Sequence, residues 1–157
     1  MVSPDWREEN WQDNLVRRAP DVPLAQKISA ALQELLLRDE GLLVRNVNER
    51  TITARFADYL RPRFPGWDVD PEYNRDGHEV KKANGAIVVP DIIVHRRGTP
   101  DNLLVIEVKK SDTTEADEEV LEKLDSFRSS HLRYRHALFV KLIVGPGGPR
   151  VGRVEWV

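Results

Sequence analysis

The strongest constraint on the fold is a pair of short apolar segments, each interrupted by a carboxylate. Within residues 87–110, apolar residues flank a Pro-Asp pair, and after a connection rich in turn residues a second apolar run leads into Glu107 and Lys109. Two such runs around a turn predict a β-hairpin. Because side chains alternate along a strand, Glu107 and Lys109 share one face, and pairing of the hairpin brings Asp91 beside them.

This combination of residues is suited to phosphodiester chemistry. A carboxylate in an apolar strand is costly unless it is paired or binds a cation. Two carboxylates held together also repel each other, and a divalent metal relieves that repulsion. Oxygen ligands for Mg²⁺, a metal-activated water and a nearby cation are the requirements for phosphodiester hydrolysis. The alternative is a structural cluster of Asp, Glu and Lys ion pairs, since such networks also perturb carboxylates.

The spacing resembles the signature of a known family. Pro90-Asp91, fifteen further residues and then Glu107-Val108-Lys109 are similar to the motif of the PD-(D/E)xK nuclease superfamily. The resemblance extends over about residues 45–145 through the order of predicted elements. It implies an α/β fold of the restriction endonuclease-like type, a central mixed β-sheet flanked by α-helices. It also implies that Asp91 and Glu107 bind Mg²⁺, for which Mn²⁺ can substitute, and that Lys109 positions or activates the attacking water.

Two more side chains are candidates for the same site. Glu49 falls in the first turn of a helix predicted over 48–64, where many family members place a glutamate, so the resemblance implies a role at the metal site. A carboxylate is also favoured there by the helix dipole alone. Lys123 lies on a helix predicted over 115–129, which in related nucleases often carries a polar residue directed at the active site. An i,i+4 pair with Glu119 explains it equally well.

The length of 157 residues indicates one domain. We expect residues 1–20 to form a helical N-terminal extension and residues 21–157 to form the single nuclease-like domain. Asp21 is a predicted cap for a helix at about 22–38, Asn48 for the helix over 48–64, and Thr113 or Thr114 for the helix over 115–129. A polar stretch at 74–85 is predicted to be a mobile loop. Further strands are predicted at 67–75, 137–144 and 150–157, with Pro71 marking an edge strand or a bulge.

Composition limits the other classes. The chain has no cysteine, which excludes disulfides and thiolate zinc sites, and His78 and His95 are isolated in sequence. No apolar run has the length of a membrane span, so we expect a cytoplasmic protein without membrane contact. The net charge is −2, yet residues 126–153 carry six basic residues and no acidic ones. This basic segment, 128–153, either contacts a phosphate backbone or balances the acidic stretch before it.

The expected function is therefore a Mg²⁺-dependent endonuclease that hydrolyses DNA in preference to RNA. The alternative is a catalytically silent nuclease-like fold that acts as a nucleic-acid-binding or assembly subunit. A third hypothesis is a structural or protein-interaction domain whose acidic strands are stabilised by ion pairs. The chain has little room for a separate recognition domain, so a homodimer or a partner subunit is the expected source of specificity.

Overall fold

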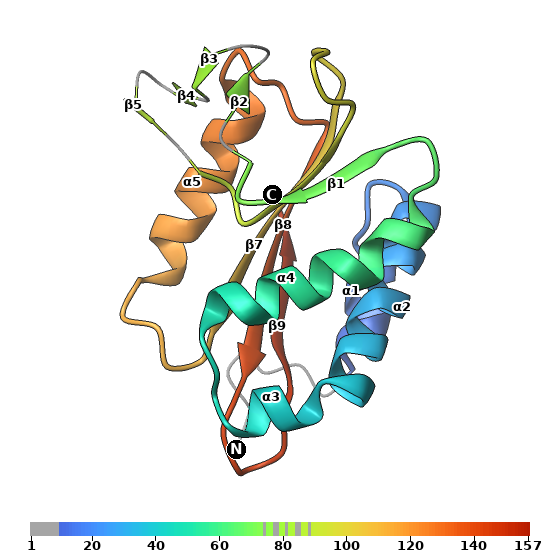
Figure 1. The fold of residues 1–157 in the computed structure, drawn as a ribbon, viewed down its shortest axis with the longest axis vertical. Helices are drawn as coiled ribbons and strands as arrows, with labels where there is room; N and C mark the ends of the chain where they lie inside the picture. Colours follow the sequence, from blue (N-terminus) through green and yellow to red (C-terminus); the bar gives the residue numbers. More distant parts are fainter. Residues whose placement is uncertain (1–9, 74, 77–78, 81, 84–85, 88) are drawn as a thin grey trace.

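The computed structural model describes residues 10–73, 75–76, 79–80, 82–83, 86–87 and 89–157, and contains a five-stranded open sheet with helices on both faces (Figure 1). The strands lie in the order β1-β6-β7-β8-β9. Their bounds are β1 (Asp68–Pro71), β6 (Ile92–His95), β7 (Asn102–Lys110), β8 (His136–Ile143) and β9 (Arg150–Trp156). Only the β7–β8 pair of this sheet is parallel. The predicted α/β class, the hairpin and the edge position of Pro71 are confirmed.

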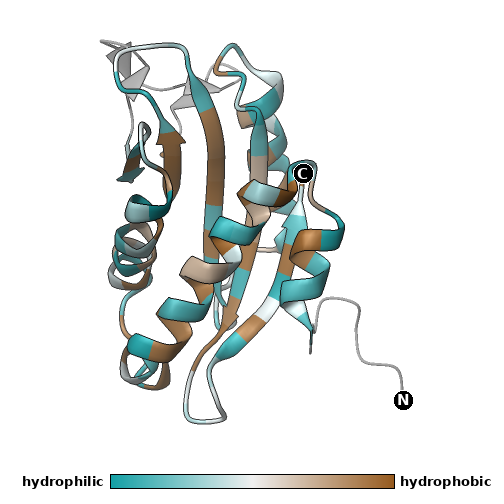
Figure 2. Ribbon diagram, turned by 90° about the vertical axis from the view of Figure 1, so that its right-hand side faces the viewer, coloured by the Kyte–Doolittle hydropathy of each residue, from teal (hydrophilic) through white to brown (hydrophobic). Residues whose placement is uncertain are grey.

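The helices divide between the two faces of the sheet. They are α1 (Trp11–Arg17), α2 (Val22–Arg38), α3 (Glu40–Val44), α4 (Glu49–Leu60) with the 3-10 turn η1 (Arg61–Arg63), and α5 (Asp117–Ser129). Helices α1 to α4 share one core with one face of the strands, and α5 packs on the opposite face. Figure 2 shows hydrophobic residues along the strands and on stripes of the helices, as burial on both faces requires.

Strand β7 carries the alternation that positions the site. Leu104, Ile106 and Val108 belong to the core under α1–α4, whereas Val105 belongs to the core under α5. Glu107 lies between Ile106 and Val108, so its side chain is directed to the α5 face. Strand β8, which follows α5 in the chain, pairs with β7 in parallel along the edge opposite to β6.

The predicted caps of α2 and α4 are confirmed, whereas the predicted cap of α5 is not. The Asp21 carboxylate accepts the Leu24 N–H at 3.0 Å, and the Asn48 side chain accepts the Arg50 N–H at 2.8 Å. The predicted Thr113 or Thr114 cap of the last helix is wrong, because α5 begins after Ala116. The Thr113 hydroxyl accepts the Glu115 N–H at 3.2 Å and so closes the preceding turn instead.

The N-terminal segment packs against the body of the fold. Trp11 and Leu15 of α1 are buried in the core shared with α2 and α4, and the Trp156 indole donates to the Leu15 carbonyl at 3.0 Å. The predicted helix is confirmed for Trp11–Arg17. Residues 3–9, which the prediction also covers, lie outside the described residues.

Two predictions around the first motif segment need correction. Residues 74–85 were expected to be a loop, but the described residues there form two short antiparallel ladders, β2 (Arg75–Asp76) with β3 (Glu79–Val80) and β4 (Lys82–Ala83) with β5 (Ala86–Ile87). His78 lies outside the described residues. The strand expected to run through Asp91 begins only at Ile92. Pro90 has no N–H to donate to a ladder, so Asp91 stands immediately before β6.

Candidate functional site

Asp91 and Glu107 meet at the start of the β6–β7 hairpin, as the sequence predicted. Ile92 pairs with Ile106, so Asp91 lies next to Glu107 across the ladder. The Asp91 N–H donates to Glu107 Oε1 at 3.3 Å, and Asp91 Oδ2 accepts the Val108 N–H at 2.8 Å. Each carboxylate is therefore fixed by the backbone of the opposite strand.

Glu107 is a buried carboxylate with unmet bonding capacity. Its side chain is 0% exposed, and Oε2 has no hydrogen-bond partner among the described residues. Burial first, and then the negative charge of Asp91, raise the pKa of Glu107 well above its ordinary value, while Lys123 opposes the shift. A buried carboxylate in this environment is stabilised by a proton or by a cation.

Lys123 extends from α5 to the carboxylate of Glu107. Its ammonium lies 3.2 Å from Glu107 Oε1 and donates to the Val89 carbonyl at 3.2 Å. Of the two explanations left open by the sequence, the structure therefore supports the one that directs Lys123 at the site. The side chain ties α5 to both segments of the motif.

Lys109 is held between two carboxylates. Its Nζ lies 2.9 Å from Glu115 Oε2 and 3.6 Å from Glu49 Oε1. Burial alone lowers the pKa of Lys109, but the hydrogen bond to Glu115 and the charges of Asp91, Glu49 and Glu107 together raise it above its ordinary value. The surroundings of Lys109 therefore favour its charged form, which donates hydrogen bonds and neutralises charge.

Glu49 belongs to the same group of side chains, but its contact is with Lys109. It begins α4, as predicted, next to the capping residue Asn48. Among the residues that the structure describes, no three acidic or histidine side chains are grouped closely enough to hold a metal ion. The predicted role of Glu49 as a metal ligand stays a prediction. The Asp91–Glu107 pair supplies carboxylate oxygens of the type that Mg²⁺ prefers.

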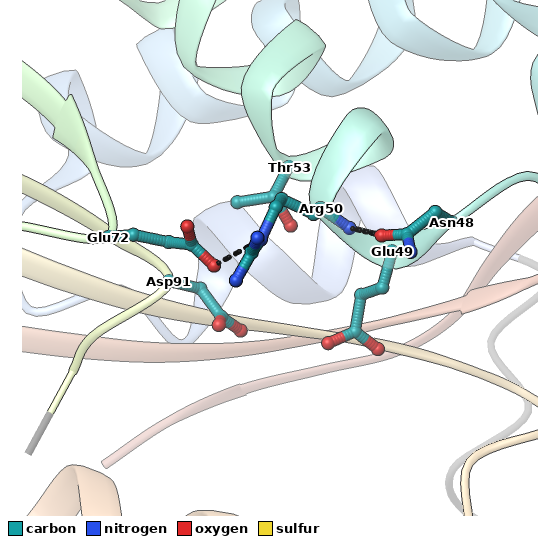
Figure 3. A pocket seen from close by; sticks show the side chains of 6 residues that line it. All are labelled: Asn48, Glu49, Arg50, Thr53, Glu72 and Asp91. Atoms are coloured by element: carbon teal, nitrogen blue, oxygen red, sulfur yellow. Dashed lines mark hydrogen bonds and ion pairs between the residues drawn. The ribbon is translucent and has the colours of Figure 1, made fainter.

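A pocket of about 440 Å³ opens beside these carboxylates (Figure 3). It is lined by six residues from α4 and from the segments next to β1 and β6: Asn48, Glu49, Arg50, Thr53, Glu72 and Asp91. The pocket gives a ligand access to the Asp91 side of the buried pair. Glu72, Thr53 and Glu115 were not predicted at the site, because no periodicity or spacing marks these polar residues, of which Thr53 is buried.

Three of the six basic residues in the segment 128–153 form ion pairs with the protein's own carboxylates. Lys141 and Arg153 lie 2.9 Å and 2.7 Å from the two oxygens of Asp117 at the start of α5. Arg135 pairs with Asp101 at 3.0 Å. For these residues the structure favours the balancing role over contact with a phosphate backbone.

His95 has a structural environment. It is 3% exposed, and its Nε2 lies 2.7 Å from Oδ2 of Asp70, which also binds Arg97. The group lies at the end of β6 away from Asp91. Through Asp70, this group links the edge strand β1 to the turn before β7. His95 is thus an ordinary polar residue of the fold, as expected, rather than a candidate catalyst.

Comparison with known proteins adds no relative to this picture. No protein-family model, curated protein or solved structure matches the chain. None of the helices in the described parts of the chain is long and apolar enough to cross a membrane. The interpretation of the site therefore depends on its own geometry and charge.

Proposed function

We propose that the protein is a Mg²⁺-dependent nuclease of the restriction endonuclease-like type, which hydrolyses phosphodiester bonds in DNA in preference to RNA. The observation that carries the proposal is the unpartnered, buried Glu107 Oε2 beside Asp91. Leaving a buried carboxylate oxygen without a partner destabilises a fold, and such a cost is typical of functional sites.

A divalent metal fits the residues present. Asp91 and Glu107 would hold the ion, and Glu49 is close enough to Lys109 to support the site from α4. Such a metal, when bound, supplies an activated water and neutralises charge on a phosphate oxygen. Mn²⁺ accepts the same oxygen ligands and is expected to substitute.

The remaining groups serve the substrate and the water. Lys109, kept protonated by Glu115 and Glu49, donates hydrogen bonds to the attacking water or to a phosphate oxygen. In this charged form Lys109 would position the attacking water. Lys123 reduces the electrostatic cost of bringing a phosphate toward the two carboxylates.

The test is cleavage of a panel of plasmid, linear, single-stranded and branched DNA together with RNA. Each substrate is incubated with Mg²⁺, Mn²⁺ or EDTA and with wild type, Asp91→Ala or Lys109→Ala. We expect metal-dependent cutting that both variants lose, by about 100-fold or more. Asp13→Ala, which removes an exposed carboxylate on α1, is the control and should cut like wild type. Equal cutting by all four proteins would refute the proposal.

A second candidate function is a catalytically silent, nucleic-acid-binding or assembly subunit. It is favoured by the engagement of Glu49 with Lys109, which leaves Asp91 and Glu107 without a third acidic ligand among the described residues. This candidate predicts no cutting of any substrate and nucleic-acid binding that EDTA does not change.

A further inference from the structure

Arg50 is placed differently from the other arginines of α4 and η1. It is the second residue of α4, its side chain is 77% exposed, and it extends into the pocket between Glu72 and Asp91 (Figure 3). Its Nε donates to Glu72 Oε1 at 3.0 Å. Both partners are solvent-exposed, so this ion pair contributes little to stability and is easily broken.

The neighbouring arginines are committed to the fold. Arg55 binds Asp39 and the Tyr59 hydroxyl. Arg61 donates twice to the Val69 carbonyl, and Arg63 donates to the Tyr59 carbonyl and to Glu34. Breaking these contacts would remove hydrogen-bond partners from buried or half-buried groups. Arg50 is therefore the arginine of this group that a ligand can recruit at low cost.

Glu72 is fixed so that its carboxylate faces this arginine. Its backbone N–H donates to the Asp91 carbonyl at 3.0 Å, and its φ is +51°, in the left-handed region that a glutamate rarely adopts. A strained backbone of this kind persists only where the surroundings hold it. The Glu72 carboxylate is therefore held next to Asp91 and in contact with the Arg50 guanidinium that lines the pocket.

We propose that this pocket is a binding subsite for a backbone phosphate of the nucleic acid, with Arg50 as its cation and Glu72 as the carboxylate that occupies Arg50 in the absence of substrate. The inference rests on the proposed function for the class of substrate. A guanidinium binds carboxylate and phosphate oxygens with the same planar donors, so the two anions compete for it. Because Asp91 lines the same pocket, the phosphate held here adjoins the one presented to Asp91 and Glu107.

Replacing Arg50 and replacing Glu72 should then change the affinity for nucleic acid in opposite directions. Arg50→Ala removes the phosphate ligand and weakens binding of nucleic acid. Glu72→Gln removes the competing charge, frees Arg50 and tightens binding. A pair that only stabilised the fold would change affinity in the same direction in both variants, or would not change it.

The experiment measures fluorescence anisotropy of labelled single-stranded DNA, duplex DNA and RNA in EDTA, where metal-dependent cleavage is stopped. We expect Arg50→Ala to bind about tenfold more weakly. The slope of log affinity against log salt concentration should fall by about one released counterion. We expect Glu72→Gln to bind about threefold more tightly. The control pair is Arg17→Ala and Asp13→Asn, which make the same charge changes at an exposed ion pair on α1.

Opposite signs for Arg50→Ala and Glu72→Gln, beyond the changes in the control pair, would support the subsite. Affinity changes of one sign, or changes no larger than those of the controls, would overturn it, and the proposed nuclease would stand if metal-dependent cleavage remained. Failure of the wild type to bind any of the three nucleic acids would overturn the subsite, and the proposed nuclease would fall with it only if none of them were cut in Mg²⁺. Thermal unfolding of each variant identifies any loss of affinity that comes from loss of fold.

Discussion

The ammonium of Lys123, on α5, lies 3.2 Å from the buried carboxylate oxygen Oε1 of Glu107, on the face of the sheet that α5 covers. The lysine compensates part of the charge that burial makes costly. It also places a positive charge next to the carboxylate that is proposed to hold the metal. In the proposed nuclease, Lys123 and a divalent ion would therefore compete for Glu107.

Replacing Lys123 by methionine should tighten metal binding. Without the ammonium, the charge of Glu107 is available to the ion, and we expect Mg²⁺ affinity at about pH 8 to rise about tenfold, equivalent to about 1.4 kcal/mol. Titration calorimetry with Mg²⁺ and the metal-induced rise in Tm measure this effect. Lys27→Met, an equal change of charge on α2, should leave metal affinity unchanged. Weaker metal binding by Lys123→Met would contradict the competition.

Glu107→Gln should stabilise the protein without metal while abolishing cleavage. The unfolded chain has the ordinary glutamate pKa of 4.5, and the folded chain has a higher one. The group therefore favours folding fully below pH 4.5, and this contribution is lost as pH rises through the folded pKa. In EDTA, the gain in free energy of unfolding from Glu107→Gln should grow as pH rises above 4.5, by up to about 1.4 kcal/mol per pH unit, and level off above the folded pKa.

Urea unfolding of both proteins at several pH values measures this gain. A difference that is constant with pH would show that Glu107 keeps its ordinary pKa. A pH-dependent gain that is accompanied by undiminished cleavage would separate Glu107 from catalysis.

Glu115→Gln should impair cleavage through Lys109. Glu115 makes the shortest contact to the Lys109 ammonium, at 2.9 Å, and is the first cause that raises the lysine pKa. Its neutralisation lets Lys109 move and lowers the lysine pKa, so we expect a cleavage rate about tenfold lower and an alkaline limb of the pH–rate profile that moves to lower pH. Glu118→Gln, an exposed change in the first turn of α5, is the matched control. A rate loss with an unmoved pH profile would indicate a purely structural role.

Asn46→Ala should destabilise the loop that leads into α4. Asn46 has φ +51°, donates to Asp112 at 2.6 Å and accepts from the Lys110 ammonium at 2.9 Å. Alanine loses both contacts and adopts this backbone poorly, so we expect a loss of about 1 kcal/mol in thermal or urea unfolding. Asn46→Gly keeps the backbone accessible and should lose less. An equal loss in both variants would assign the whole effect to the side-chain contacts.

Local patterns in the sequence predicted the elements that bear the site. The apolar runs around Asp91 and Glu107 predicted a hairpin and their proximity, and the Asp21 and Asn48 caps located α2 and α4. These features follow from alternation, turn residues and caps, all of which act over a few residues. The delayed start of β6 follows from Pro90 for the same local reason.

The sequence by itself determined the α/β class and the meeting of Asp91 with Glu107, because both depend on short-range periodicity and on a hairpin between neighbours in the chain. Only the tertiary structure decided which charged side chains meet there: Lys123 on Glu107, Glu115 on Lys109 and Arg50 on Glu72. Periodicity separates buried from solvent-facing positions, but it does not record which neighbouring element a polar side chain faces. That choice is made when α4 and α5 pack on opposite faces of the sheet and their ends converge at the β6–β7 hairpin.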